Sequence, residues 1–222
     1  ISDHSEHLSL PERGLLIDEC RRLSGRVLLL PGIEFAHSGR HVIVHAPGAC
    51  LRDLTDEQAV CRPGIVREQG GMTVWAHPAV TYALSLREGA SVPYDGWEIW
   101  NLKVDGPFPN TALLTELQSL SAGRRPLLFA GWDMHTSLPP DSGPRLVVSA
   151  ETDTITTESL LQNLLAGRYR IEGGRGRSID AREQTLSAPF SRAAVSWIHH
   201  RLTRSDCAAR SLAHRLKTKF EA

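Results

Sequence analysis

The sequence has few cysteines, and none of them are paired. The four cysteines in 222 residues form no C-x-x-C pair. Thiolate zinc sites use closely spaced cysteine pairs, so we do not expect a site of this class. A disulfide framework is typical of small secreted domains rather than of a chain of this size. We therefore expect reduced, buried thiols and a cytoplasmic protein. The cysteines are Cys20, Cys50, Cys61 and Cys207.

An excess of charge of either sign is also absent. The 25 basic residues balance 25 acidic ones, which gives a formal net charge of zero. No apolar run approaches the roughly 20 residues needed to span a bilayer. Without an overall charge to attract polyanions, we expect neither nucleic acid nor a membrane as a partner. The basic segment from Arg192 to Lys219 is the exception, and a solvated helix face is its simpler interpretation.

Several common catalytic motifs are missing. There is no G-x-S-x-G nucleophile motif, no Walker loop and no G-x-G-x-x-G following a strand. A serine nucleophile, an NTPase and a dinucleotide-binding enzyme therefore have no support in the sequence.

Short apolar runs alternate with helix-like segments along the first two thirds of the chain. This rhythm predicts an α/β fold with mostly parallel pairing. We expect an α/β barrel domain over residues 1–167. Residues 168–222 are expected to form an Arg/Gly-rich loop followed by C-terminal helices packed on the same domain. The predicted strands are 26–35, 40–48, 70–79, 95–101, 125–135 and 145–150, and the first two could pair with each other. The predicted helices are 11–23, 55–60, 80–89, 110–120 and 156–167. Thr55 and Gln58 fit a capping box at the start of the helix over 55–60, and Asn110 is the predicted N-cap of the helix over 110–120.

Histidines and carboxylates recur in or at the ends of these strands. In α/β folds, ligands collect at the carboxyl edge of the strands, so we expect these side chains to converge. Imidazole and carboxylate suit zinc, manganese and iron. Two or three such ions lower the pKa of a bound water and clamp a tetrahedral transition state, which indicates metal-assisted hydrolysis. A single histidine is more often structural, so the hypothesis depends on the whole set. The set is Asp3, His4, Glu34, His41, His45, His77, Glu98, Asp133 and His135.

The order of these motifs resembles one known family. The segments "SDH" (2–4), "PGIE" (31–34), "GRHVIV" (39–44), "VWAHP" (74–78), "DGWEIWN" (95–101) and "GWDMH" (131–135) resemble the PHP (polymerase and histidinol phosphatase) superfamily over residues 1–136. The resemblance implies a distorted (β/α)7 TIM-like barrel. It also implies a multinuclear site that hydrolyses small-molecule phosphoesters, or other esters in some branches. The motif spacing and the helix "TTESLLQNLLAGRY" look most like the branch of carbaryl-type ester hydrolases.

The resemblance also assigns candidate roles. The middle histidine ligand is open between two residues, because His41 and His45 are four apart on one strand face. We favour His41. The metal ligands implied are His4, Glu34 as a bridging carboxylate, His41, His77, Asp133 and His135, and the residues supporting them or contacting substrate are Asp3, His45, Glu98, Asn101 and Arg168.

One family motif is missing. Members open with D-x-H-x-H/S on the first barrel strand, and no such motif occurs here. The chain starts at Ile1 in what resembles the end of a strand, so we expect the sequence to begin inside a domain and to lack the first strand.

Two alternatives to a hydrolase remain. One is a catalytically impaired or regulatory module of the same type, and the other is a PHP-type nuclease supported only by the basic C-terminal segment.

Overall fold

The computed structural model describes most of the first 187 residues. The described ranges are 2–25, 27–78, 91–105, 109–110, 113–114, 117, 126–133, 143–149, 155–173, 177–181 and 186–187.

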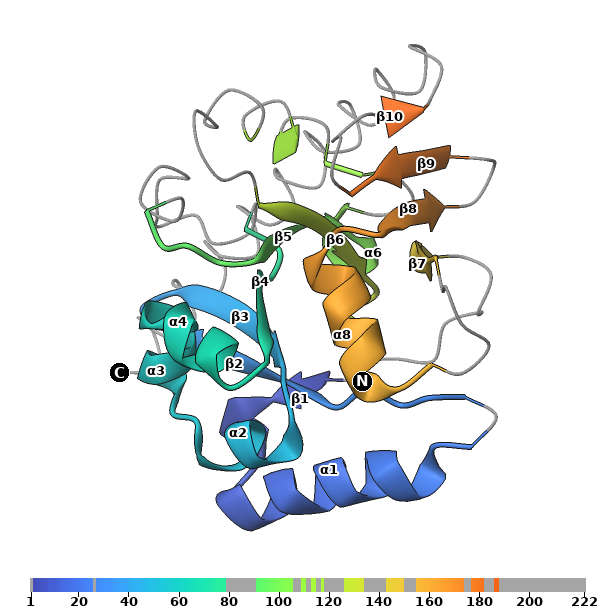
Figure 1. The fold of residues 1–222 in the computed structure, drawn as a ribbon. Coiled ribbons are helices and arrows are strands. Elements are labelled where there is room, and N and C mark those ends of the chain that lie inside the picture. Colours follow the sequence, from blue (N-terminus) through green and yellow to red (C-terminus); the bar gives the residue numbers. More distant parts are fainter. Residues whose placement is uncertain are drawn as a thin grey trace.

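A six-stranded sheet forms the centre of the N-terminal part of the fold, between Ser2 and Gly131 (Figure 1). Its order is the chain order, from β1 to β6. β1 and β2 are parallel, β3 is antiparallel to both of its neighbours, and β4, β5 and β6 are parallel. Five strands therefore run in one direction and β3 alone runs against them. The strands are β1 (Ser2–His4), β2 (Gly32–His37), β3 (Arg40–His45), β4 (Met72–Trp75), β5 (Gly96–Asn101) and β6 (Leu127–Gly131).

The predicted pairing of the strands over 26–35 and 40–48 is confirmed, since β2 and β3 form a tight hairpin. Ser38 and Gly39 join β2 to β3 with φ values of 51° and 75°. Two consecutive residues with positive φ are typical of the type I′ turn, whose twist matches that of the flanking strands. Side chains alternate across the pair, because successive residues of a strand point to opposite faces. Ile33, Phe35, Val42 and Val44 are fully buried on one face, which leaves the other face for polar side chains.

Helices cover the apolar face of β2, β3 and β4. α3 packs on β2 and β3, α4 packs on β4, and α1 packs on α2 (Figure 1). The predicted capping box of α3 is confirmed, since the side chains of Thr55 and Gln58 each accept a hydrogen bond from the other's backbone N–H. The helices are α1 (Leu10–Leu23), α2 (Gly48–Asp53), α3 (Asp56–Cys61), α4 (Pro63–Glu68), α6 (Leu102–Asp105) and α8 (Thr157–Leu165), with a 3-10 turn η1 (Ser5–His7).

Two predicted helices can be followed only in part or not at all. The helix predicted over 80–89 lies outside the described residues. At the start of the helix predicted over 110–120, the side chain of Asn110 accepts a 3.0 Å hydrogen bond from the N–H of Leu113. Asn110 is therefore an N-cap, as predicted.

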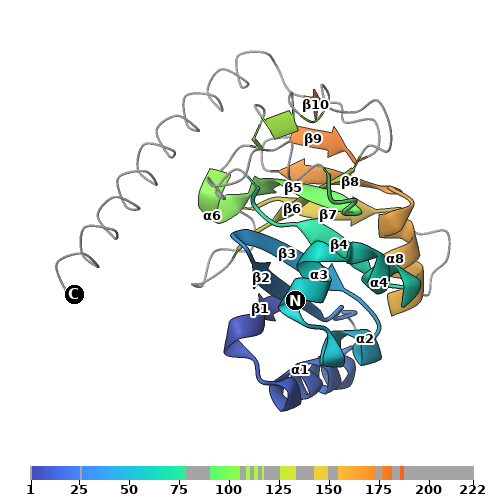
Figure 2. The same ribbon diagram turned by 90° about the vertical axis from the view of Figure 1, so that its left-hand side faces the viewer.

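A second sheet follows the first in the chain. Its four strands are antiparallel in the order β10-β9-β8-β7 (Figure 2). The prediction of a loop over residues 168–178 is wrong, because β8 and β9 occupy most of it. Alternation explains the strands, since Tyr169, Ile171 and Ile179 are buried while Arg170 lies exposed between two of them. The strands are β7 (Arg145–Val148), β8 (Tyr169–Gly173), β9 (Arg177–Asp180) and β10 (Leu186–Ser187).

The two sheets share one hydrophobic core. The hydroxyl of Tyr169 donates a 2.8 Å hydrogen bond to the carbonyl of Leu128, and its ring lies 5.3 Å from that of Phe129. The predicted α/β class is confirmed, with a first sheet that is mostly parallel. Within the described residues the first sheet is open, with β1 and β6 as its outer strands, and closure into a barrel is not seen. No helix in the described part of the chain is long and apolar enough to cross a membrane.

Candidate metal centre

The direction of the strands brings the predicted ligands to one edge of the first sheet. His4 and Asn101 end β1 and β5, and His77 and Asp133 each follow a strand by two residues. Because β3 runs against the others, its start lies at the same edge as their ends. His41, the second residue of β3, therefore joins the residues at the carboxyl ends of the parallel strands.

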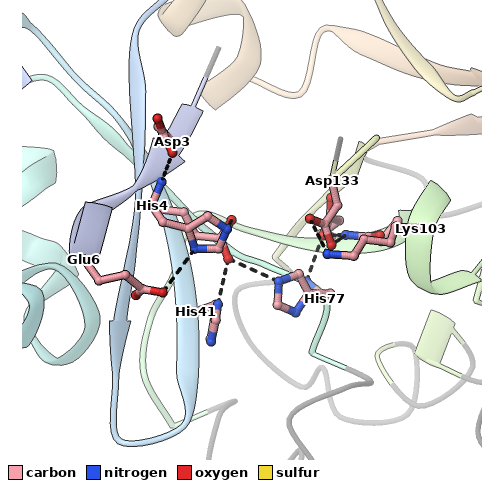
Figure 3. A network of polar contacts seen from close by, with 10 residues as sticks. Asp3, His4, Glu6, His41, His77, Lys103 and Asp133 are labelled. Carbon is pink, nitrogen blue, oxygen red and sulfur yellow. Dashed lines mark hydrogen bonds and ion pairs between the residues drawn. The ribbon is translucent and has the colours of Figure 1, made fainter. Parts of the chain in front are cut away.

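Glu34 is the centre of the resulting cluster (Figure 3). Its Oε1 atom lies 2.7 Å from Nδ1 of His41 and 3.2 Å from Nε2 of His77. Its Oε2 atom lies 4.0 Å from Nε2 of His4, which faces Glu34 directly across the β1–β2 pair. One carboxylate thus has an imidazole on three sides, and each imidazole comes from a different segment of the chain.

Three of these residues could hold a metal ion. One ligand atom from each of His4, Glu34 and His41 lies within 4.8 Å of the others. The ring of His77 lies 5.1 Å from that of His41. The buried Nδ1 of His77 has no hydrogen-bond partner among the described residues, so a ring nitrogen remains for an ion. The donor set of imidazole and carboxylate is one that zinc, manganese and iron accept.

Electrostatics favour an ionised Glu34. Burial alone would raise the pKa of Glu34, but the hydrogen bonds from His41 and His77 and the nearby charges outweigh it and hold that pKa far below its usual range. His77 shows the reciprocal effect. Burial opposes its protonation, whereas Glu34, Glu98 and Asp133 raise its pKa above the ordinary value. The cluster therefore stabilises positive charge beside Glu34, which is the property that a bound cation would use.

An unusual backbone conformation turns His77 toward the cluster. Val42 pairs with Trp75, so both lie on the face opposite His41, and strict alternation would place His77 on that opposite face as well. His77 instead has a φ of 30°, in the left-handed region. Its N–H donates a 2.8 Å hydrogen bond to Oε2 of Glu98. Strained backbone of this kind concentrates at functional sites.

Glu98 supports His77 from β5. A register shift at Glu98–Trp100 breaks the pairing of β5 with β6, which adds one residue to β5. Without this bulge, Glu98 and Asn101 would be three residues apart on opposite faces. With it, Nδ2 of Asn101 donates a 3.0 Å hydrogen bond to Oε2 of Glu98. Gly131 on β6 leaves room for Glu98, because a Cβ at that position would collide with Oε1 of Glu98.

Asn101 connects Glu98 to Asp133. Its Oδ1 accepts a 3.0 Å hydrogen bond from the N–H of Val104, which fixes the orientation of the amide. The amide nitrogen therefore faces both carboxylates, and it lies 3.3 Å from Oδ2 of Asp133. Asp133 has a φ of 47°, in the left-handed region like that of His77. Its Oδ1 lies 3.4 Å from the ammonium of Lys103, which projects from α6 (Figure 3).

Not every predicted residue joins the cluster. His45 lies at the far end of β3, where its Nδ1 donates a 3.1 Å hydrogen bond to the carbonyl of Pro31. Burial lowers the pKa of His45 to about 4, so its ring is neutral. Asp3 is exposed, and its carboxylate accepts a bond from the N–H of His4. Arg168 is exposed between α8 and β8. His135 lies outside the described residues.

Three residues of the site were missed in the sequence. Lys103 follows "WEIWN" without any motif of its own, and a lysine alone has no diagnostic spacing. Glu6 belongs to the short turn η1 that follows β1, and its Oε1 lies 3.9 Å from Nδ1 of His4. Gly131 was noticed only as part of "GWDMH", because the bulge in β5 that brings Glu98 against it has no signal in the sequence. No protein-family model and no curated protein matches this chain.

Proposed function

We propose that this chain is a metal-dependent hydrolase of small-molecule phosphoesters or related esters. The observation that carries the proposal is Glu34, whose two oxygens face the imidazoles of three histidines from three different segments. A carboxylate in this position is suited to bridging two cations. The same residues carry the resemblance to the PHP superfamily, and the (β/α)7 barrel of that family belongs to this proposal.

The proposed ligands divide into two groups around Glu34. His4 and His41 lie on the side of β1 and β3, while His77 and Asp133 lie on the side of β4 and β6 (Figure 3). The six-residue ligand set includes His135 from the motif alone. Two or three ions of zinc, manganese or iron would lower the pKa of a bound water and offset charge on the reacting oxygens.

The chain's own residues supply rigidity and orientation. Asn101 holds the carboxylates of Glu98 and Asp133, and Glu98 fixes the backbone of His77. Such supporting hydrogen bonds fix the direction of ligands and tune the ions they hold. The buried position of Glu98 and the exclusion of solvent around it strengthen these interactions.

Metal analysis combined with hydrolysis assays tests the proposal. The purified protein is expected to retain zinc, manganese or iron, and to hydrolyse p-nitrophenyl phosphate or p-nitrophenyl acetate. Glu34→Gln keeps the shape of the side chain and removes its charge, so we expect it to lose both the ions and the activity. Glu19→Gln is the matched control, because Glu19 is an exposed residue of α1 paired with Arg22.

Two outcomes separate the alternatives. Ion retention without hydrolysis of either compound would favour the regulatory module. A folded protein that binds no ion and hydrolyses neither compound would refute the proposal.

A further inference from the structure

We propose that the ammonium group of Lys103 binds the anionic oxygens of the substrate, so that the metal centre acts on phosphomonoesters in preference to neutral esters. The inference rests on the proposed function and narrows its substrate class. It starts from the position of Lys103, the second residue of α6, directly after β5.

Lys103 lies on the solvent side of the centre. Its side chain is 51% exposed, whereas that of Asp133, its partner at 3.4 Å, is 13% exposed. The lysine side chain thus reaches Asp133 from α6 with about half of its surface open to solvent (Figure 3). A molecule approaching the ligands from solvent would meet Lys103 on this side.

The ammonium has donors to spare. A lysine carries three N–H donors, and among the described residues the contact with Asp133 uses one of them. A half-exposed ion pair of this length adds little to stability, so stability alone gives weak reason for its placement. The remaining donors suit an acceptor with several oxygens, and lysine binds phosphate as a point charge.

Ion binding would change the partner that Lys103 prefers. Once Asp133 holds a divalent cation, its negative charge is offset and the ammonium faces a net positive neighbour. Like charges at such short range are unfavourable unless an anion lies between them. A phosphomonoester brings up to two negative charges and three oxygens to that place, whereas a neutral ester brings none. The charge pattern therefore favours the phosphomonoester.

The test measures phosphate binding separately from catalysis. Inorganic phosphate is titrated calorimetrically into wild-type protein loaded with Mn²⁺, and into the variants Lys103→Gln, Lys103→Arg and Arg145→Gln. Arg145 is the control cation, since its exposed side chain pairs with Glu172 on the second sheet. Loss of a charge-assisted hydrogen bond corresponds to about a tenfold to hundredfold weakening. We expect this loss for Lys103→Gln, partial recovery for Lys103→Arg and no change for Arg145→Gln.

Manganese content and two assays complete the experiment. We expect Lys103→Gln to keep its manganese and to lose kcat/KM for p-nitrophenyl phosphate by a similar factor, which is larger than any loss of kcat/KM for p-nitrophenyl acetate. Equal phosphate affinity in wild type and Lys103→Gln overturns the inference, as does loss of manganese from the variant. Failure of the wild type to bind phosphate also overturns it. Absence of hydrolysis by the wild type, with phosphate binding that depends on Lys103, refutes only the proposed function.

Discussion

The carboxylate of Glu98 on β5 lies against Gly131 on β6, and the glycine leaves the space that the carboxylate fills. A Cβ at residue 131 would collide with Oε1 of Glu98. Glu98 in turn accepts the N–H of His77 and the amide of Asn101. The absence of one methyl group on β6 therefore determines the position of a residue on the loop after β4.

Gly131→Ala tests this relationship. The added methyl group must displace Glu98, so we expect a loss of about 1–3 kcal/mol in the free energy of unfolding, as for other overpacked sites. Urea denaturation provides the measurement. Gly64→Ala is the control, since nothing lies within 4 Å of a Cβ there and alanine favours its helix α4. An unchanged stability of Gly131→Ala would show that Glu98 can move without cost.

Asn101→Asp tests the orientation of the amide. The substitution keeps the shape but replaces the donor that faces Glu98 and Asp133 with an acceptor. We expect at least about 1–3 kcal/mol of destabilisation, since a third carboxylate would then stand where Glu98 and Asp133 share a donor. Asn101 is 1% exposed, so solvent offers little relief. Thermal denaturation at neutral pH measures the effect, and recovery at acidic pH is expected because protonation restores a donor. A variant as stable as wild type at neutral pH would contradict this account.

His41→Asn tests the assignment of the middle histidine. Among the two candidates on β3, His41 contacts Glu34 and His45 does not. We therefore expect His41→Asn to weaken metal binding, and chelators to strip the variant at lower concentration than wild type. His37→Asn is the matched control, because His37 is three residues from Glu34 and lies on the opposite face of β2. Equal metal affinity in the two variants would remove His41 from the ligand set.

The lowered pKa of His45 predicts that the stability of the fold depends on pH. Burial lowers its pKa in the folded state to about 4, from an ordinary value of 6.5. Above pH 6.5 both states are neutral and His45 contributes no pH dependence. As the pH falls from 6.5 to 4 the unfolded chain takes up a proton that the folded ring does not, so stability is lost, by up to about 3 kcal/mol.

Urea denaturation of the metal-free protein between pH 7 and pH 4 checks this, with His45→Gln as comparison. The variant lacks the titrating ring, so its stability is expected to fall less steeply than that of wild type over this interval. Parallel pH profiles for the two proteins would show that His45 titrates normally in the folded state.

Much of the first sheet could be predicted from local pattern. The hairpin of β2 and β3, the capping box at Thr55 and the N-cap at Asn110 follow from residues close in sequence, and the structure confirms each. The position of Glu34 beside His41 also follows, because register in a short hairpin is fixed by its turn.

The bulge in β5, the backbone conformation of His77 and the second sheet could not be predicted, because they depend on tertiary contacts that the local sequence pattern does not encode. The bulge in β5 decides that Glu98 and Asn101 share a face, and nothing in "WEIWN" shows where an extra residue will be accommodated. The left-handed backbone of His77 overrides the alternation that would have turned it away. The strands β8 and β9 were missed because arginine and glycine dominate the segment 168–178 that holds them, while burial of Tyr169 and Ile171 against β6 and β9 was decided by tertiary packing.

The two-residue turn between β2 and β3 has a consequence for how this chain can change. His41 reaches Glu34 only because the hairpin pairs it with Ala36. Ala36 and Glu34 are two residues apart on β2, so the side chains of Glu34 and His41 lie on the same face of the sheet. Lengthening the turn by a single residue could slip the register by one position and send His41 to the helix-covered side of the sheet. The length of the loop at Ser38–Gly39, an outlying stretch with no ligand of its own, is thus as constrained as the identity of the histidine it positions.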